Sequence, residues 1–429
     1  MVWFIFLKGI IMRKNVFIVP FCVVVMSFFS GFSQSAFINL SLKDAIELGL
    51  KNNPEIKSSY QKIGASRGRL LSAFSPASPD ISITHDYIPM GQNINRYGEK
   101  TVGVSQPIEF PTSYFLRGSK YSIEKAIAEN EFALTRLAII SNIKRSYFNV
   151  LALLEQVKIA QENLEIAQDF VCKAEIRHAV GEGANLEKLT AKVTYTEARN
   201  NVEIQKNHLA AAFAELNFAL GNGKEESKTL LLADTLAFIP FDFTLSRLTD
   251  DAMAANPALK AGKLRVDSYS KEKLLAWSSL LPTFNLGYFN KQVRDDAKGY
   301  YGASLSIGIP LWFMLDQRGR ILEASSNVSS AEAEFKTANN DVYAKTQAAF
   351  AEFKHEENQV RLYVQDILPQ AQEIFLTASK SYEAGEITYM EFLQAQQTLI
   401  HSKGSYAEAL LSYNLSIVTI EEAIGKTLQ

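Results

Sequence analysis

The chain has 429 residues, of which 47% are hydrophobic, and a formal net charge of −2. This charge balance provides no basic surface for nucleic acid, and the hydrophobic content is too low for a bundle of membrane-spanning helices. The length allows two or three ordinary domains or one elongated domain.

The N-terminus, residues 1–35, has the layout of a secretory signal peptide. A basic start at Arg13 and Lys14 precedes an apolar run, and the small residues that follow predict cleavage between about Ser33 and Ala36. The alternative is an N-terminal membrane anchor. No later stretch holds the ~18 uninterrupted apolar residues that a further membrane-spanning helix needs.

The rest of the chain is predicted to be a tandem repeat. Its two Asn-Pro pairs begin at Asn53 and Asn256, 203 residues apart, and each asparagine can cap a helix that starts with proline. Five more landmarks recur at an offset of 203 or 204 residues: Pro79 and Pro282, Gly181 and Gly385, Leu189 and Leu393, Ala191 and Ala395, and Gly221 and Gly425. We therefore predict a first structural repeat over 36–221, a linker over 222–243 and a second repeat over 244–429.

Each repeat is expected to begin with a helix that carries the Asn-Pro break and ends near residue 75 or 280. Two segments of alternating apolar residues follow, and a period of two is typical of strands with one apolar face. The alternating positions are Ile81, Ile83 and Tyr87, then Val102, Val104, Ile108 and Phe110, and in the second repeat Phe284, Leu286 and Tyr288, then Tyr301, Ala303, Leu305, Ile307 and Ile309.

A very long helix is predicted next, over about 113–178 and again over about 320–383. Valine or leucine recurs every seven residues from Val150 to Val171, and leucine or alanine follows three positions later, which indicates a coiled-coil seam rich in small residues. At 1.5 Å per residue each rod would be roughly 100 Å long. The rods are expected to end at Gly181 and Gly385, and the shorter helices that return to end at Gly221 and Gly425.

Four strands with one apolar face fit either a membrane or a covered soluble sheet. β-Structure spans a bilayer only as a closed barrel, and closed barrels need about eight strands or more. Four strands per chain would therefore require two or three chains to close a barrel. The alternative is a small soluble sheet that caps the rods and buries its apolar face on helices.

Three stretches, LSLKDAIELGLKNNPEIK, RHAVGEGANLEKLTAK and SYEAGEITYMEFLQAQQTL, resemble the TolC-type outer-membrane efflux proteins, as do the LG and IG pairs that end the repeats. The resemblance covers nearly all of the chain after the signal peptide and includes that family's duplication. It implies a mixed fold: a long α-helical coiled-coil tunnel and a transmembrane β-barrel formed by a homotrimer with four strands per protomer. It also implies an outer-membrane location with a periplasmic extension, a periplasmic membrane-fusion adaptor and an inner-membrane pump as partners, and no catalysis or cofactor of its own.

The resemblance assigns functional residues to the far end of the tunnel. The turns that would dock the adaptor are Gly181, Glu182 and Gly183 in the first repeat and Gly385, Glu386 and Ile387 in the second. The residues that match the family's periplasmic gate are Glu391, Gln394, Tyr382 and Glu187. Gln394 stands where a second acid is expected, and Ile387 replaces a basic residue, which predicts a looser gate. Threefold symmetry would make Glu391 a ring of three carboxylates that favours cations; the alternative is a solvated helix face.

The segment SQPIEFPTSY, residues 105–114, is similar to the heavy-metal branch of this family, which implies a pump of the resistance-nodulation-division type that exports metal ions. The five histidines are scattered without metal-ligand spacing, so no metal site is predicted. Cys172 is the only cysteine after the signal peptide, and a packing role is predicted for it.

Enzyme motifs are incomplete in this chain. The stretch GNGKEESK lacks the first glycine and the final serine or threonine of a phosphate-binding loop. Catalysis is therefore not expected. The alternative to an efflux duct is a secreted coiled-coil scaffold or adhesion protein without a pore.

Overall fold

The computed structural model describes residues 38–181, 183–222, 230–294, 296 and 298–428, so the predicted signal peptide lies outside the described residues. The elements of the first half are β1 (Ile38–Leu40), α1 (Leu42–Asn52), α2 (Pro54–Ser72), β2 (Asp80–Asp86), β3 (Glu99–Ile108), α3 (Pro111–Ala179) and α4 (Asn185–Ala219). Those of the second are β4 (Leu230–Leu232), α5 (Leu245–Ala255), α6 (Pro257–Ser278), β5 (Thr283–Val293), β6 (Tyr300–Gly308), α7 (Asp316–Leu362), a π-helical segment (Tyr363–Ile367), α8 (Leu368–Glu383) and α9 (Tyr389–Ile424).

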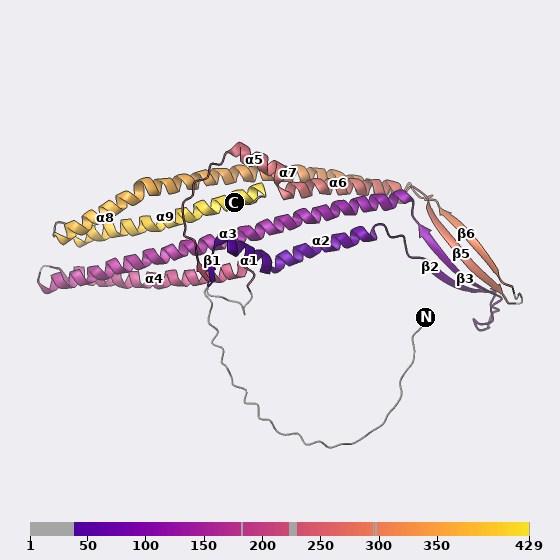
Figure 1. Cartoon of the computed structure of the whole chain (residues 1–429), viewed down its shortest axis with the longest axis horizontal. Helices are drawn as coiled ribbons and strands as arrows, with labels where there is room; N and C mark the ends of the chain where they lie inside the picture. The colour runs from indigo at the N-terminus through magenta and orange to yellow at the C-terminus, as the bar shows by residue number, and fades with distance from the viewer. Residues whose placement is uncertain (1–37, 182, 223–229, 295, 297, 429) are drawn as a thin grey trace, which may run out of the picture.

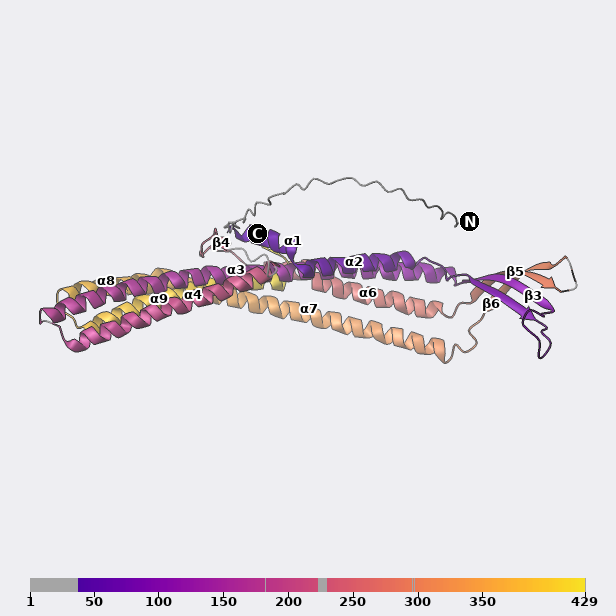
Figure 2. The ribbon, with the colours of Figure 1, turned by 90° about the horizontal axis from the view of Figure 1, so that it is seen from below.

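The molecule is a long ribbon of helices with a sheet at one end (Figure 1). In the half next to the sheet, neighbouring helices lie in the order α2, α3, α6 and α7, and in the other half they lie in the order α4, α3, α9 and α8. Figure 2 shows that the helices form one layer rather than a closed bundle. The strand order β2-β3-β5-β6 repeats the order of the helices to which the strands connect. Four helices or four strands therefore lie side by side along the whole ribbon. The edge helices α2 and α7 are directly connected to the edge strands β2 and β6.

The four-stranded antiparallel sheet carries the predicted apolar residues on a single face. Cross-strand partners share a face, and the register places Ile81, Val104, Tyr288 and Ala303 in one row across the four strands. The next row toward the helices contains Leu286 and Leu305 together with the polar Gln106. The opposite face carries mainly polar and small residues, among them Ser82, Thr84, Thr101, Gly103, Ser105, Asn285, Gly287, Ser304 and Ser306.

The apolar face of this sheet is not covered by helices. Ile81, Leu286, Tyr288, Leu305 and Ile307 are all exposed in the chain. The soluble alternative, in which this face is buried on helices, is therefore wrong. The strands also end earlier than the alternation predicts, since Tyr87, Phe110 and Ile309 lie just outside them.

Each Asn-Pro break packs against the glycine that ends its own half. A Cβ on Gly221 would lie 2.9 Å from Asn53 Cα, and a Cβ on Gly425 would lie 2.7 Å from Pro257 Cδ. Both glycines have a positive φ, 73° and 74°. Glycine is needed at these two positions for both the backbone conformation and the close approach. The landmarks that recur in the sequence thus meet in space.

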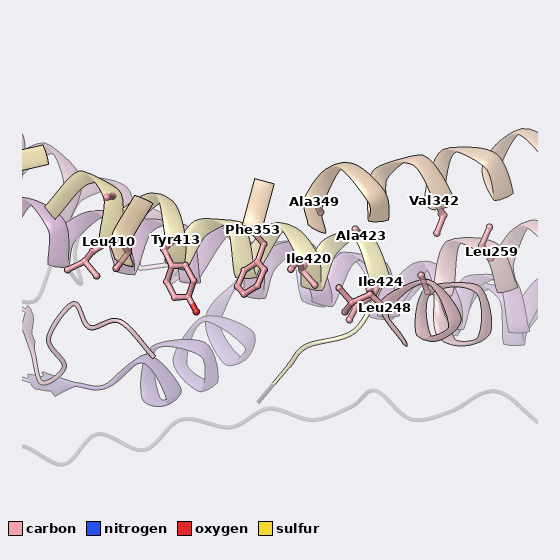
Figure 3. Packing of buried hydrophobic residues seen from close by; sticks show 13 residues of the cluster. Leu248, Leu259, Val342, Ala349, Phe353, Leu410, Tyr413, Ile420, Ala423 and Ile424 are labelled. Carbon is pink, nitrogen blue, oxygen red and sulfur yellow. The ribbon is translucent and has the colours of Figure 1, made fainter. Parts of the chain in front are cut away.

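Two hydrophobic cores lie near the middle of the ribbon, one in each half. Figure 3 shows the second core, in which the buried rings of Phe353 and Tyr413 pack between α7 and α9. The first core is built around the buried side chains of Tyr147 and Leu216. Leu236, in the linker, contacts both cores. The linker therefore joins the two halves through apolar contacts as well as through the chain.

Tyrosine hydroxyls hold the linker on both cores. Tyr147 Oη donates to Asp234 Oδ2 (2.7 Å) and lies 2.9 Å from Leu40 O, while Tyr413 Oη donates to Ile239 O (2.7 Å). β1 and β4 pair in parallel next to the first of these contacts. The sequence did not predict this small sheet, because three-residue strands give too short a pattern to recognise.

A buried ion pair joins α3 to α9. Lys144 Nζ lies 2.6 Å from Glu421 Oε2, and the Glu421 side chain is almost completely buried. Burial raises the pKa of the Glu421 carboxyl, and Lys144 opposes that rise. Arg145 and Glu422 form a second pair beside it, 2.8 Å apart. Removing one member of the buried pair would leave an uncompensated charge, so this contact fixes the relative position of the two helices.

The second long helix is interrupted, unlike the single stretch predicted over 320–383. The π-helical segment Tyr363–Ile367 separates α7 from α8, and Pro369 lies in the first turn of α8. Proline has no N–H, and its ring clashes with the carbonyl four residues earlier, so a wider π turn accommodates it. The first long helix is continuous, as predicted.

The coiled-coil seam of α3 is buried mainly through its small residues. Ala160, Ala167 and Ala174 are buried, whereas Val157 is half-buried. Small residues allow close approach of the neighbouring helices. Cys172 on the same helix is exposed, so the predicted packing role for it is wrong.

Replacement of Gly425 by alanine should destabilise the fold more than the same replacement of Gly385. Both glycines have a positive φ, 74° and 75°, which costs alanine about 1–2 kcal/mol. Only at Gly425 would the new Cβ meet neighbouring atoms, because no atom lies within 4 Å at Gly385. The melting temperatures of the two alanine variants in detergent, each compared with that of the wild type, measure the difference. An equal decrease in both variants would contradict the close contact of Gly425 with Pro257.

Candidate functional site

Two helix hairpins reach the end of the ribbon opposite the sheet (Figure 1). Gly181, between α3 and α4, has a φ of 84°, and Gly385, between α8 and α9, has a φ of 75°. A side chain would have free space at both positions, so the positive φ alone makes glycine the suitable residue there. Gly183 N donates to Arg177 O (3.0 Å) and closes the first turn. Glu182 lies outside the described residues.

The second turn is closed by its own polar groups. Glu386 N donates to Ser381 O (2.8 Å), and Ser381 Oγ donates to Glu386 Oε2 (3.2 Å). Ile387 packs against a nearby aromatic cluster instead of facing solvent alone. The basic residue that the resemblance led us to expect at this position would not fit that apolar contact.

The aromatic cluster joins the two hairpins just inside the turns. Phe170 of α3 stacks on Tyr389 and Phe392 of α9, with ring centroids 4.3 and 5.3 Å apart, and lies 5.2 Å from Tyr382 of α8. All four rings are buried. Aromatic pairs at these distances contribute about 0.5–1.5 kcal/mol beyond their burial. Sequence reasoning missed this cluster, because its members lie on three helices and share no spacing.

Tyr382 and Glu187 meet across the hairpins, as the resemblance implied. Tyr382 Oη donates a hydrogen bond to Glu187 Oε1, and the Arg177 guanidinium lies 5.1 Å above the Tyr382 ring. Burial, with the Glu187 carboxylate second, raises the pKa of Tyr382 to about 12. The contact connects α8 with α4, so it links the first hairpin to the second.

Glu391 and Gln394 lie apart from that contact. Glu391 Oε2 accepts hydrogen bonds from Thr388 N (2.7 Å) and Thr388 Oγ1 (2.9 Å), which forms a capping box at the start of α9. These hydrogen bonds, the backbone one first, lower the pKa of the exposed Glu391 carboxyl. Both residues line a shallow groove between α8 and α9 that Ile387 also lines. Glu391 therefore has a structural role that its match to a gate residue did not reveal.

Exposed ion pairs add a second connection between the hairpins. Lys173 Nζ of α3 lies 2.8 Å from Glu383 of α8 and 3.0 Å from Asp169. The pKa of Lys173 is raised, first by the hydrogen bond to Glu383. Such solvated pairs contribute little to stability, about 0–1 kcal/mol. These ion pairs can therefore break with little loss of free energy.

Throughout the ranges that the structure describes, no helix is long and apolar enough to cross a membrane. The same ranges hold no group of three or more histidine, cysteine, aspartate or glutamate side chains arranged to bind a metal ion.

Known proteins resemble this chain in both sequence and fold. A family model described as "Outer membrane efflux protein" matches residues 45–222 and 248–426. The chain is 22% identical over 421 residues to the outer membrane protein TolC of Escherichia coli, with 92% of this chain and 85% of the relative covered. It is 21% identical over 396 residues to the cobalt-zinc-cadmium resistance protein CzcC of Cupriavidus metallidurans, with 92% of each covered. The Campylobacter jejuni CmeC outer membrane channel matches the fold with a TM-score of 0.77 at 17% identity, over 90% of this chain and 85% of that chain.

The Tyr382 hydroxyl should titrate at unusually high pH. Since the folded pKa is raised above the ordinary value near 10, the contact with Glu187 is fully stabilising below about pH 10 and weakens as pH rises toward about 12. The absorbance change near pH 12 should lose the contribution of one tyrosine in Tyr382→Phe, while Tyr413, whose pKa is also about 12, still contributes. Glu187→Gln should lower the midpoint of the Tyr382 contribution, with burial keeping it above 10. A wild-type midpoint near 10 for this residue would contradict the buried contact.

Proposed function

The chain belongs to the outer membrane efflux protein family, and on this basis we propose that it is the outer-membrane channel of a tripartite efflux system. In this proposal it is a passive duct that carries cargo across the periplasm and the outer membrane. The observation that carries the proposal is the four-stranded sheet, whose exposed apolar face is backed by a polar face. A membrane barrel needs that combination of an apolar exterior and a polar interior.

We infer that three copies close the barrel and the tunnel. The sheet in one chain has open edges at β2 and β6, and three sheets would give twelve strands. The four helices at each level would give twelve around a tunnel. The barrel would lie in the outer-membrane lipid, and the helices would extend into the periplasm. This arrangement accounts for the exposed apolar face, which a secreted coiled-coil scaffold does not.

The signal peptide predicted over residues 1–35 would direct the chain to this location. The repeats predicted over 36–221 and 244–429 would each supply two strands and one long hairpin, and the linker over 222–243 would connect them. The family model matches the chain twice, which supports a tandem duplication.

The hairpin ends are proposed to meet the periplasmic adaptor and, through it, the inner-membrane pump. The ends of the two hairpins, α3 with α4 and α8 with α9, are the parts of the ribbon farthest from the sheet (Figure 1). The contact between Tyr382 and Glu187 would hold the two hairpins together in the closed state. Opening would require this contact to break and the rings of the aromatic cluster around Phe170, to which Tyr382 belongs, to shift against one another.

Metal ions are the cargo that we propose, with a pump of the resistance-nodulation-division type. The similarity of segment 105–114 to the heavy-metal branch and the match to CzcC over most of both chains support this choice. A conduit needs no fixed metal site, so its cargo is decided by the pump and by the charge of the pore.

Glu391 is proposed to form a ring of three carboxylates near the narrow end of the pore. Its carboxylate is exposed, and its low pKa keeps it ionised. A ring of this kind attracts cations, which suits export of metal ions. Gln394 on the next helical turn would leave the ring weaker than one with two acids per chain.

The lipid-facing assignment can be tested with two neighbouring residues of β6. Leu305→Lys should prevent assembly, because lysine facing lipid near the membrane centre costs about 2–4 kcal/mol, whereas Ser304→Lys on the opposite face should be tolerated. The measurements are the amount of trimer in outer membranes and the resistance to copper, silver, zinc, cobalt and drugs of a deletion strain that carries each variant.

If Leu305→Lys and Ser304→Lys gave equal amounts of trimer and equal resistance, the proposal of a membrane barrel would be wrong. A deletion strain that becomes sensitive to drugs alone would overturn the metal cargo while leaving the duct in place.

Glu391→Gln should weaken the block of single channels by a trivalent cation such as hexaamminecobalt. A decrease of about tenfold in blocker affinity corresponds to about 1.4 kcal/mol. Glutamine can still accept the hydrogen bond from Thr388 N, so the helix cap is kept. Glu386→Gln, on the exposed turn, is the matched control. An unchanged block in Glu391→Gln would show that the residue serves only as a cap.

A further inference from the structure

The connection between β6 and α7 carries an unusual run of exposed apolar side chains. Residues 311–315 read LWFML, and each of these five side chains is exposed in the chain, with Trp312 77% exposed. Leu322, two turns into α7, is exposed as well. A contiguous apolar surface of this kind marks an interaction site. We name residues 311–315 the apolar connector.

The equivalent segment of the first half has no irregular connector before its helix. There Pro111 directly starts α3, and Ser113 is buried with its Oγ 3.2 Å from Ser278 Oγ. The second half instead has five residues between Pro310 and the start of α7 at Asp316. The apolar connector is therefore a feature of the second half alone, and the general strand-to-helix connection does not require it.

The apolar connector lies at an edge of the ribbon. Close to the sheet, α7 has α6 as its neighbour on one side, and no helix of the described chain packs along its other side. The opposite edge is formed by α2, which packs on α3. That edge also carries exposed apolar side chains at its sheet end: Leu71 is 74% exposed and Phe74 is 55% exposed.

Phe74 is held in a fixed position at that second edge. Its ring lies against α3 at Gly118, where an added Cβ would be only 2.3 Å from the ring. The ring therefore rests on α3 with one part and presents the remainder outward. The two edges of one chain thus offer two apolar surfaces at the same end of the helices.

Strand direction brings these two surfaces together between copies. β6 runs toward the helices and ends at Gly308, whereas β2 runs away from them and starts at Asp80. If β6 of one copy pairs with β2 of the next in the same antiparallel order as the rest of the sheet, the end of β6 lies beside the start of β2. The segment after β6 then lies beside the segment before β2, which contains Phe74.

We propose that the apolar connector of one copy docks on Leu71 and Phe74 of the next copy. This contact would close the ring of helices directly below the membrane barrel, where the strands alone provide only backbone hydrogen bonds. The proposal rests on the threefold assembly of the proposed function. The partner that covers the apolar connector is a second copy of this chain. The alternative, in which lipid at the membrane surface covers the connector, is an outcome of the test.

Cysteine cross-linking tests the contact directly. In a Cys172→Ser background, the double variant Trp312→Cys with Phe74→Cys is treated in outer membranes with a short bismaleimide. Denaturing gels should then show dimers and trimers for the double variant and monomers for each single variant. Because α2 and α7 are opposite edges of one chain, a cross-link within a monomer would overturn the proposal.

A second measurement separates this proposal from the function on which it rests. Trp312→Ala should lower the temperature at which the detergent-extracted trimer dissociates, whereas Trp277→Ala, on α6 away from both edges, should not. A double cysteine variant that forms trimers but does not cross-link, together with quenching of Trp312 fluorescence by brominated lipids in a Trp277→Phe variant, would place the connector in the membrane and overturn the inference alone. Monomers in the wild-type protein would overturn both proposals.

Discussion

The open edges of the four-stranded sheet are the constraint on which the rest of the structure depends. Within the described residues, β2 and β6 each pair on one side only, so a row of backbone N–H and C=O groups on each edge has no partner in the chain. A bilayer offers no water to satisfy such groups. A sheet with an apolar face of this kind can therefore meet lipid only when other copies pair with both edges. The edge helices α2 and α7 must then also lie beside helices of other copies, because they are connected to the edge strands.

Stability along the ribbon is unevenly distributed in a way that suits a duct with a moving end. The two cores near the middle are joined by Leu236 and reinforced by the buried pair of Lys144 and Glu421. Toward the hairpin ends, the contacts between halves include an aromatic cluster, the hydrogen bonds of Tyr382 with Glu187 and of Tyr389 with Thr194, and exposed ion pairs such as that of Lys173 with Glu383. Exposed pairs separate at little cost, so the hairpin ends can change their spacing while the middle stays intact.

The candidate site was partly predictable from the sequence. Resemblance placed Tyr382 and Glu187 together, and the structure has them in contact. Resemblance did not reveal that Glu391 completes a capping box with Thr388, although the T-x-x-E spacing is a local signal that could have shown it. The aromatic cluster around Phe170 was not predictable, because its rings come from α3, α8 and α9 and meet only after the hairpins pack.

The sequence by itself determined the elements whose signals are local or periodic. The Asn-Pro breaks, the alternating strands and the positive-φ turns at Gly181 and Gly385 follow from backbone preferences that act within a few residues. Only the tertiary structure decided which distant residues meet. The packing of Gly425 on Pro257, the pairing of β1 with β4 and the strand order β2-β3-β5-β6 depend on contacts between segments far apart in the chain. Such contacts leave no periodic pattern in one sequence, because each partner satisfies its local preferences equally well without the other.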